Sequence, residues 1–178
     1  MREIEAKVKV SRLAPVREKL KSLGATFKEV EQEENLIFDR EPGTWKTKDT
    51  VLRLRKGNRV SLTYKGPQEK GPLKIRPEYQ VDVSDFAMMK RILDALGFQC
   101  VFTYLKRRED YAYKGCAVSL DEVEGLGTFV EVEGPSEGQV LTVLKELGFG
   151  QKEAIKDSYV KLLLLKGKKG KMQDQTQK

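Results

Sequence analysis

Apolar residues recur every three or four positions in three segments of the chain, a spacing typical of amphipathic helices. Each segment begins near a serine and ends at a Leu-Gly pair, as helices do when a side chain caps the first turn and a glycine follows the last. The pattern predicts helices from Ser11 to Gly24, from Ser84 to Gly97 and from Ser136 to Gly148, with a short fourth helix over about 157–166.

Charged and apolar residues alternate in the segments between these helices, which is the pattern of a β-strand with one apolar face. Because many of these strands follow one another without an intervening helix, we expect an α+β fold with an antiparallel sheet or barrel. The alternation predicts strands over residues 3–10, 34–39, 52–55, 60–65, 78–83, 102–110, 117–121 and 129–133.

Two loops that contain proline and glycine, residues 40–50 and 66–74, are expected to be mobile. Trp45 in the first loop has two interpretations: an aromatic surface for a nucleotide base, or a local packing anchor.

Residues two apart on a strand share a face, so each predicted strand separates its charges from its apolar residues. The simplest interpretation is a sheet with helices on the apolar face and water on the other. However, the second face carries mainly full charges, including several arginines, instead of the usual mixture of threonine, serine and glutamine. Since three amphipathic helices can cover the outside of a closed sheet, we favour charges that point into a hydrated tunnel.

The charges on these faces suit a polyanion together with a divalent metal ion. Arginine and lysine bind phosphate oxygens, and carboxylates two residues apart suit a metal that bridges phosphates. A nucleic-acid groove or a site for acidic substrates would leave the carboxylates unexplained. The acids are Glu3, Glu5, Glu78, Asp121, Glu131 and Glu133, and the bases are Lys7, Arg53, Arg55, Lys65, Arg76, Lys106 and Arg108.

Composition narrows the chemistry and the location. The 178 residues contain no histidine, which excludes Ser-His-Asp triads, Cys-His dyads and histidine-ligated metals. The sequence contains only two cysteines, Cys100 and Cys116, which are too few for a disulfide scaffold or a cysteine-based zinc site. We expect both to be buried, reduced thiols. The leucine run 162–165 is far too short for a membrane span, and no secretory pattern opens the sequence, so a cytoplasmic protein is expected.

The last residues of the chain are strongly basic. Residues 166–178 contain five lysines and one aspartate, and therefore carry +4 of the net charge of +7. We predict one domain over residues 1–165 and a basic, disordered tail over 166–178. Such a tail attracts nucleic acid, but a solubilising end is the simpler interpretation, so nucleic acid is not an expected partner.

The order of these motifs resembles that of the CYTH proteins, also called triphosphate tunnel metalloenzymes. The resemblance covers residues 1–165 and implies a closed eight-stranded antiparallel β-barrel with helices outside, which binds a triphosphate end-on with Mg²⁺ or Mn²⁺. The matching motifs are the ExExK signature at Glu3–Lys7, Leu52–Arg55, Thr63–Pro67, Lys106-x-Arg108, Asp121, Phe129-x-Glu131-x-Glu133 and Asp157–Tyr159.

The resemblance also implies roles for individual residues. The metal ligands would be Glu3, Glu5, Glu131 and Glu133, with Asp121 nearby and Glu78 as a further carboxylate. Arg76 joins the phosphate-binding group on the strand pattern alone, and Lys65, Lys106 and Glu5 are the catalytic candidates. The remaining phosphate-binding residues would be Lys7, Arg53, Arg55, Lys65, Lys106 and Arg108.

Three functions are compatible with these residues. The pattern as a whole is most similar to class IV adenylyl cyclases, which implies attack of the 3′-hydroxyl of ATP on the α-phosphorus, giving cyclic AMP and pyrophosphate. The alternative is a triphosphatase for tripolyphosphate, thiamine triphosphate or a nucleoside triphosphate, in which Lys65 or Lys106 orients or deprotonates water. A third interpretation, based mainly on the basic tail, is a non-catalytic binder of polyphosphate, nucleotide or RNA. A homodimer is compatible with each.

Overall fold

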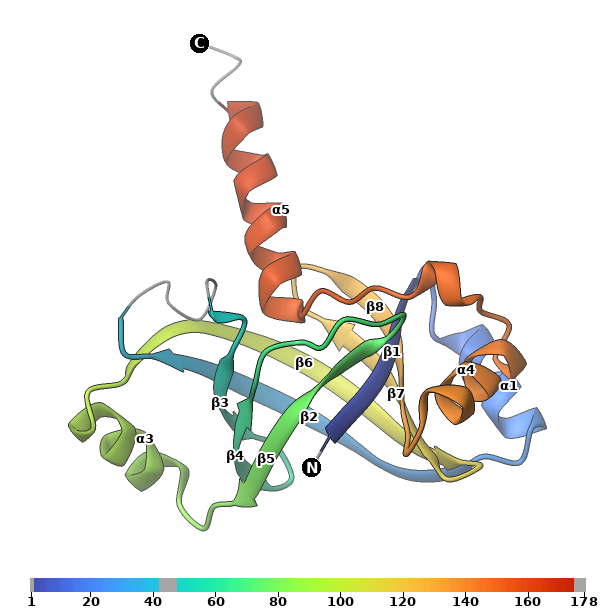
Figure 1. The fold of residues 1–178 in the computed structure, drawn as a ribbon, viewed down its shortest axis with the longest axis horizontal. Helices are drawn as coiled ribbons and strands as arrows, with labels where there is room; N and C mark the ends of the chain where they lie inside the picture. The colour runs from blue at the N-terminus through green and yellow to red at the C-terminus, as the bar shows by residue number, and fades with distance from the viewer. Residues whose placement is uncertain (1, 42–47, 175–178) are drawn as a thin grey trace.

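Eight antiparallel strands close into a ring in the described part of the chain (Figure 1). The structure is a computed structural model that describes residues 2–41 and 48–174, so Trp45 lies outside the described residues. Around the ring the order is β1-β5-β4-β3-β2-β6-β7-β8, and β8 pairs with β1. The strands are β1 (Arg2–Val10), β2 (Thr26–Asp39), β3 (Val51–Lys56), β4 (Val60–Lys65), β5 (Lys74–Asp82), β6 (Gln99–Tyr113), β7 (Cys116–Val123) and β8 (Gly127–Glu133).

The helices lie outside the ring. Figure 1 shows α1 and α4 together on one side, α3 on the far side, and α5 rising from one end of the barrel. The predicted α+β barrel with external helices is therefore confirmed. The helices are α1 (Ala14–Ser22), α3 (Phe86–Ala95), α4 (Glu137–Glu146) and α5 (Tyr159–Asp174), with a short 3₁₀ helix over Gln151–Glu153.

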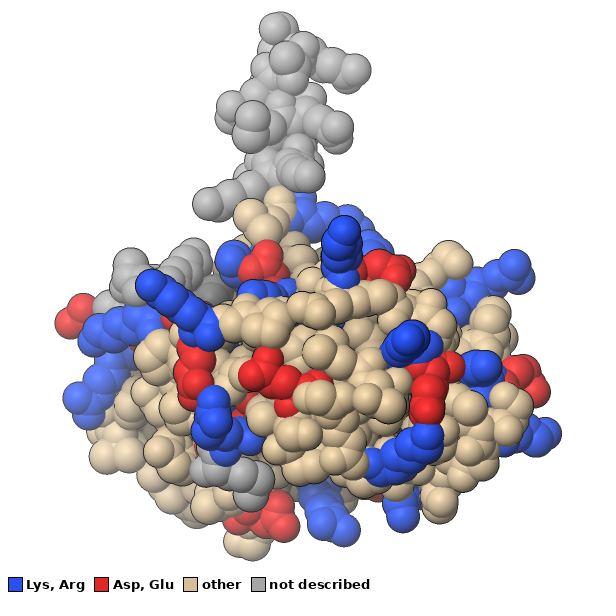
Figure 2. Space-filling view, turned by 45° about the vertical axis from the view of Figure 1, so that its right-hand side comes forward, with Lys and Arg blue, Asp and Glu red and all other residues tan. Residues whose placement is uncertain are grey.

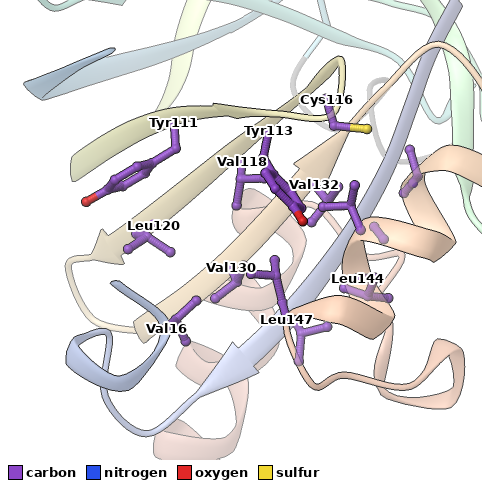
Figure 3. Close-up of a cluster of buried hydrophobic side chains, with 14 of the residues drawn as sticks. Val16, Tyr111, Tyr113, Cys116, Val118, Leu120, Val130, Val132, Leu144 and Leu147 are labelled. Atoms are coloured by element: carbon purple, nitrogen blue, oxygen red, sulfur yellow. The ribbon is translucent and has the colours of Figure 1, made fainter. Parts of the chain in front are cut away.

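The largest hydrophobic core lies between the barrel wall and helices α1 and α4, not inside the barrel (Figure 3). Val118, Leu120 and Val130 are fully buried on the outer faces of β7 and β8, where they pack with Val16 of α1 and Leu144 of α4. Because the apolar faces of these strands turn outward, their inner faces are available for charged side chains.

The helix starts agree only in part with the predicted caps. Ser136 caps α4, accepting a hydrogen bond of 3.3 Å from the backbone N of Gln139. In α3 the cap is Asp85, one residue after the predicted Ser84. The predicted Ser11 cap of α1 is wrong, because that helix begins at Ala14 with Pro15 in its first turn, where the fixed proline φ favours a helix start.

Several strands are longer than predicted, and β2 and β5 begin the most residues early. β2 begins at Thr26 instead of residue 34; residues 28–34 contain a single apolar residue, Val30, so this part of the strand has no apolar face to predict it. β5 begins at Lys74 instead of 78, and Pro77, which has no N–H, lies where β5 changes its partner from β1 to β4. The loop predicted over 66–74 therefore ends in a strand residue.

The C-terminal helix is also longer than predicted. α5 continues to Asp174, so most of the segment expected to be a disordered tail is helical in this structure. The division of the chain at residue 165 stays a prediction. Among the described helices, none combines the length and the apolar character needed to cross a membrane. Cys116 is buried as expected, but Cys100 is exposed, so that part of the prediction is wrong.

Candidate active site

The inner faces of the strands enclose a cavity of about 440 Å³. All of the predicted site residues except Asp121 line it, so the structure brings together side chains from six of the eight strands. Their roles toward metal and phosphate stay predictions. The predicted residues in the cavity wall are Glu3, Glu5, Lys7, Arg53, Arg55, Lys65, Arg76, Glu78, Lys106, Arg108, Glu131 and Glu133.

Lys106 and Arg108 on β6 lie between two buried carboxylates on the neighbouring strands. Glu33 of β2 is opposite Lys106, and Asp121 of β7 is opposite Arg108. The Lys106 Nζ atom is 3.2 Å from Glu33 Oε2 and 3.5 Å from Asp121 Oδ1. Arg108 donates two hydrogen bonds to Asp121, of 2.7 Å through Nε and 2.6 Å through Nη2. Asp121 therefore lies behind the cavity wall as the partner of two basic side chains.

Ammonium groups separate the carboxylates on the opposite wall. Lys65 Nζ is 2.6 Å from Glu3 Oε1 and 3.0 Å from Glu78 Oε2. Lys7 Nζ lies between Glu5 Oε1 at 3.3 Å and Glu131 Oε1 at 3.2 Å.

Lys74, which the sequence analysis missed, is 3.0 Å from Glu5 Oε2. Lys7, Lys65 and Lys74 therefore each neutralise carboxylates of the wall.

The charges in the wall shift the pKa values of its carboxyl groups in two directions. Burial raises the pKa of Glu5, but Lys74 and Lys7 outweigh it and lower that pKa to about 2. Burial opposes the charge of Glu33 as well, yet Lys106 and Arg108 hold its pKa well below the ordinary value. For Glu133, which remains exposed at the end of β8, partial desolvation and then the nearby charge of Glu3 raise the pKa to about 7. Negative charge is therefore in excess beside Glu133.

A hard divalent cation fits this acidic wall. Glu3 Oε2 and Glu5 Oε1 are buried and accept no hydrogen bond, and a cation would relieve the raised pKa of Glu133. Within residues 2–41 and 48–174 no three acidic side chains form a ready-made metal site, since lysines occupy the space between them. Metal binding therefore requires these lysines to turn toward another anion, such as a phosphate.

The inner layer at one end of the barrel is apolar. Tyr159 and Val160, at the start of α5, pack against it. The Tyr159 ring centroid is 4.2 Å from Lys7 Nζ, and its hydroxyl donates a 2.7 Å hydrogen bond to Asp121 Oδ2. The charged part of the cavity is thereby bounded by α5. The layer consists of Ile37, Val51, Tyr104, Val123 and Phe129.

Sequence reasoning missed Lys74 and Tyr159 in the cavity wall, and Glu31 and Glu33 behind it, for identifiable reasons. Glu31 and Glu33 continue the alternation of β2, but the predicted strand began only at residue 34. Lys74 continues the spacing of Arg76, but it was assigned to a loop. Tyr159 was noted only as part of a terminal motif. Longer strand bounds would have identified Glu31, Glu33 and Lys74.

Basic and acidic side chains are interspersed over the face shown in Figure 2. That face has no continuous basic stripe of the kind that follows a nucleic-acid backbone. Within the described part of the chain, charged side chains also gather in the cavity.

Comparisons with known proteins agree with this geometry. The model of the CYTH domain matches residues 1–159 of the chain. A protein of Methanocaldococcus jannaschii, named "Putative adenylate cyclase MJ0240", is 33% identical over 172 residues, which cover 91% of this chain and 98% of that protein.

Solved structures show the same fold. PH1819 of Pyrococcus horikoshii OT3 is 32% identical with a TM-score of 0.78, and the match covers 92% of this chain and 99% of PH1819. HpAC1 of Hippeastrum, described with a dominant triphosphatase activity, is 20% identical with a TM-score of 0.61, over 82% of this chain and 88% of HpAC1. At that identity the likeness concerns the fold alone.

Proposed function

Because the chain belongs to the CYTH domain family, we propose that it is a divalent-metal-dependent enzyme of the class IV adenylyl cyclase type, converting ATP into cyclic AMP and pyrophosphate. The observation that carries this proposal is the cavity itself, in which arginines and lysines face carboxylates around about 440 Å³ of space. A triphosphate with its metal ions supplies both signs of charge to such a wall. A cytoplasmic location completes the proposal and agrees with the two free thiols.

The phosphate chain would be bound by the basic side chains of the wall. Arg53 and Arg55 offer planar forks on β3, and Lys106 and Arg108 extend the group along β6. Lys74 joins the predicted set, because it lies in the same wall beside Glu3 and Glu5.

The metal, Mg²⁺ or Mn²⁺, would be held by Glu3, Glu5, Glu131 and Glu133, with Glu78 close by. When bound, such an ion neutralises phosphate charge and makes a hydroxyl group more acidic. Glu5 is the candidate proton acceptor and is ionised at neutral pH. Lys74 and Lys7 hold its pKa at about 2, so it would be a weak base until those lysines turn toward phosphate. The basic side chains would stabilise the leaving pyrophosphate.

Hydrolysis of a triphosphate is the second candidate. Its support is the fold shared with HpAC1 and the cavity wall, where six strands contribute charged side chains. In this reaction Lys65 and Lys106, each between two carboxylates, would orient water and phosphate as cationic donors. The two reactions use the same phosphate-binding side chains and differ in the attacking group.

Product analysis tests the proposal. The protein is incubated with ATP or with tripolyphosphate, each with Mg²⁺ or Mn²⁺, and the products are separated. Cyclic AMP plus pyrophosphate supports the cyclase, whereas orthophosphate supports the triphosphatase. Turnover that is unaffected by Glu131→Ala would contradict both assignments. Tripolyphosphate binding without turnover would favour the non-catalytic binder.

A further inference from the structure

Glu33 is a carboxylate that the proposed reaction does not use, although it lies in the basic half of the barrel. Its side chain is completely buried on the inner face of β2. Four polar groups surround it: Asn35 Nδ2 donates at 3.1 Å, Lys106 Nζ lies at 3.2 Å, Arg55 Nη1 at 3.4 Å and Arg108 Nε at 3.9 Å. The charge of Arg53 also acts on it. Glu33 thus faces four cations, three of which it shares with other carboxylates: Lys106 and Arg108 also contact Asp121, Arg108 contacts Glu131, and Arg55 contacts Glu31.

The cations around Glu33 are the same groups that the proposed function assigns to phosphate. Without a counter-charge, four buried cations would repel one another and lose solvation, which is costly in a protein interior. Glu33 supplies part of that counter-charge in the ligand-free protein. It also repels any phosphate that enters, because both are anions on the same side chains.

The position of Glu33 opposes a role as metal ligand. Its Oε2 atom contacts Lys106 and Asn35, and its Oε1 atom contacts Arg55 and Arg108. Both oxygens therefore already have cationic or N–H partners, whereas Glu3 retains an oxygen, Oε2, that accepts no hydrogen bond and is in none of the ion pairs of Glu3 described above. The place of β2 in the barrel also opposes a metal-binding role, since Glu33 lies across the ring from the paired carboxylates of β1 and β8.

We propose that Glu33 is a positioning residue that occupies the phosphate-binding cations in the ligand-free protein and competes with the incoming triphosphate. This inference rests on the proposed function, since it concerns the same cavity. It predicts that neutralising Glu33 strengthens binding of the phosphate chain, although Glu33 is the ion-pair partner of Lys106, Arg55 and Arg108. A structural role alone would leave affinity unchanged or lower it.

The experiment measures binding of sodium tripolyphosphate in EDTA by calorimetry, so that only the cationic half of the site contributes. Glu33→Gln, which keeps the shape, is expected to lower the Kd by roughly three- to tenfold, because one anion at close range is removed. Glu33→Asp keeps the charge, so its Kd is expected to stay within about twofold of wild type on the same electrostatic argument.

Thermal unfolding provides the second readout. Without ligand, Glu33→Gln is expected to unfold at a lower temperature than wild type, since its cations have lost their partner. Saturating tripolyphosphate should reduce that difference, because phosphate oxygens replace the carboxylate.

Glu109→Gln is the matched control. Glu109 lies on the outer face of β6 and contacts Arg17 and Arg107. Its destabilisation should be the same with and without tripolyphosphate.

Two outcomes would overturn the inference. One is an equal or higher Kd for Glu33→Gln; the other is a loss of stability that ligand leaves unchanged. If Glu33→Gln does not fold, Glu33→Asp provides the test. A Kd of Glu33→Asp that is more than twofold higher than that of wild type also overturns the inference. Failure of the wild-type protein to bind tripolyphosphate with or without metal instead contradicts the proposed function, and the inference fails with it.

Discussion

The phenolic hydroxyl of Tyr159 donates a 2.7 Å hydrogen bond to Asp121 Oδ2, and this bond joins residues 38 positions apart. It links the first turn of α5 to the carboxylate that orients Arg108. Both residues are buried, with Asp121 fully inaccessible to solvent. The C-terminal helix is therefore connected through Asp121 to Arg108 and Lys106 in the cavity wall.

The contacts of Asp121 bear on its predicted role as a metal ligand. Arg108 occupies both carboxylate oxygens, and Tyr159 and Lys106 add further contacts. A metal ion would have to displace these partners. The contacts instead fit a residue that holds Arg108 in place, and the metal assignment of Asp121 stays a prediction.

Tyr159→Phe should separate the contribution of the hydroxyl group from that of the aromatic ring. The ring remains against Phe129 and Lys7, but Asp121 loses one donor. We expect a loss of about 1–2 kcal/mol in the free energy of unfolding and a higher KM for the triphosphate substrate. Urea unfolding and steady-state kinetics measure the two effects. Tyr79→Phe is the control, since Tyr79 is 63% exposed, and equal behaviour of the two variants would contradict this account.

Arg108→Lys tests whether the fork geometry matters beyond charge. Lysine keeps the charge but loses the paired N–H donors that bind Asp121 and reach the cavity. The expected result is a KM raised by about tenfold, which corresponds to the loss of one charged hydrogen bond. Arg107→Lys, one position away on the outer face of β6, should leave KM unchanged. A similar KM for both variants would argue against a phosphate-binding Arg108.

The pKa of Glu133 predicts proton release on metal binding. Partial desolvation and Glu3 raise its pKa to about 7, so part of the ligand-free protein carries a proton there at neutral pH. A bound cation favours the ionised form and expels that proton. Calorimetric titration with Mn²⁺ at pH 7 in two buffers of different ionisation enthalpy should show release by wild type and none by Glu133→Gln. Equal release by both proteins would remove Glu133 from the metal site.

The lowered pKa of Glu109, which lies outside the cavity, predicts that its contacts with Arg17 and Arg107 stabilise the fold less at acid pH. Hydrogen bonds from Arg17, opposed by partial burial and assisted by Arg107, lower its pKa to about 2 from 4.5. A carboxyl group with a lowered folded-state pKa stabilises the fold above about pH 4.5, and this contribution disappears as the pH falls toward 2. Glu109→Gln should therefore cost about 1–2 kcal/mol at pH 7 and progressively less below pH 4.5. Urea unfolding across this range checks it, and a pH-independent difference would contradict it.

The sequence was sufficient to predict which strand faces carry the site, because side chains alternate across a strand whatever its partners. Glu3, Arg55 and Glu131 therefore converge as expected. Glu33 was missed because residues 28–34 contain only one apolar residue and so show no apolar alternation, and Lys74 was missed because Pro77 interrupts the pattern of its strand. The bond between Tyr159 and Asp121 depends on where α5 meets the barrel, and no local pattern encodes that relationship.

The most direct test of the central claim is a crystal of the protein soaked with tripolyphosphate and Mn²⁺, with manganese located by its anomalous scattering. The account predicts manganese beside Glu3, Glu5, Glu131 and Glu133, and phosphate oxygens on Arg53, Arg55, Lys106 and Arg108. Manganese and phosphate bound only on the outer surface, with the cavity side chains still paired to one another, would contradict it.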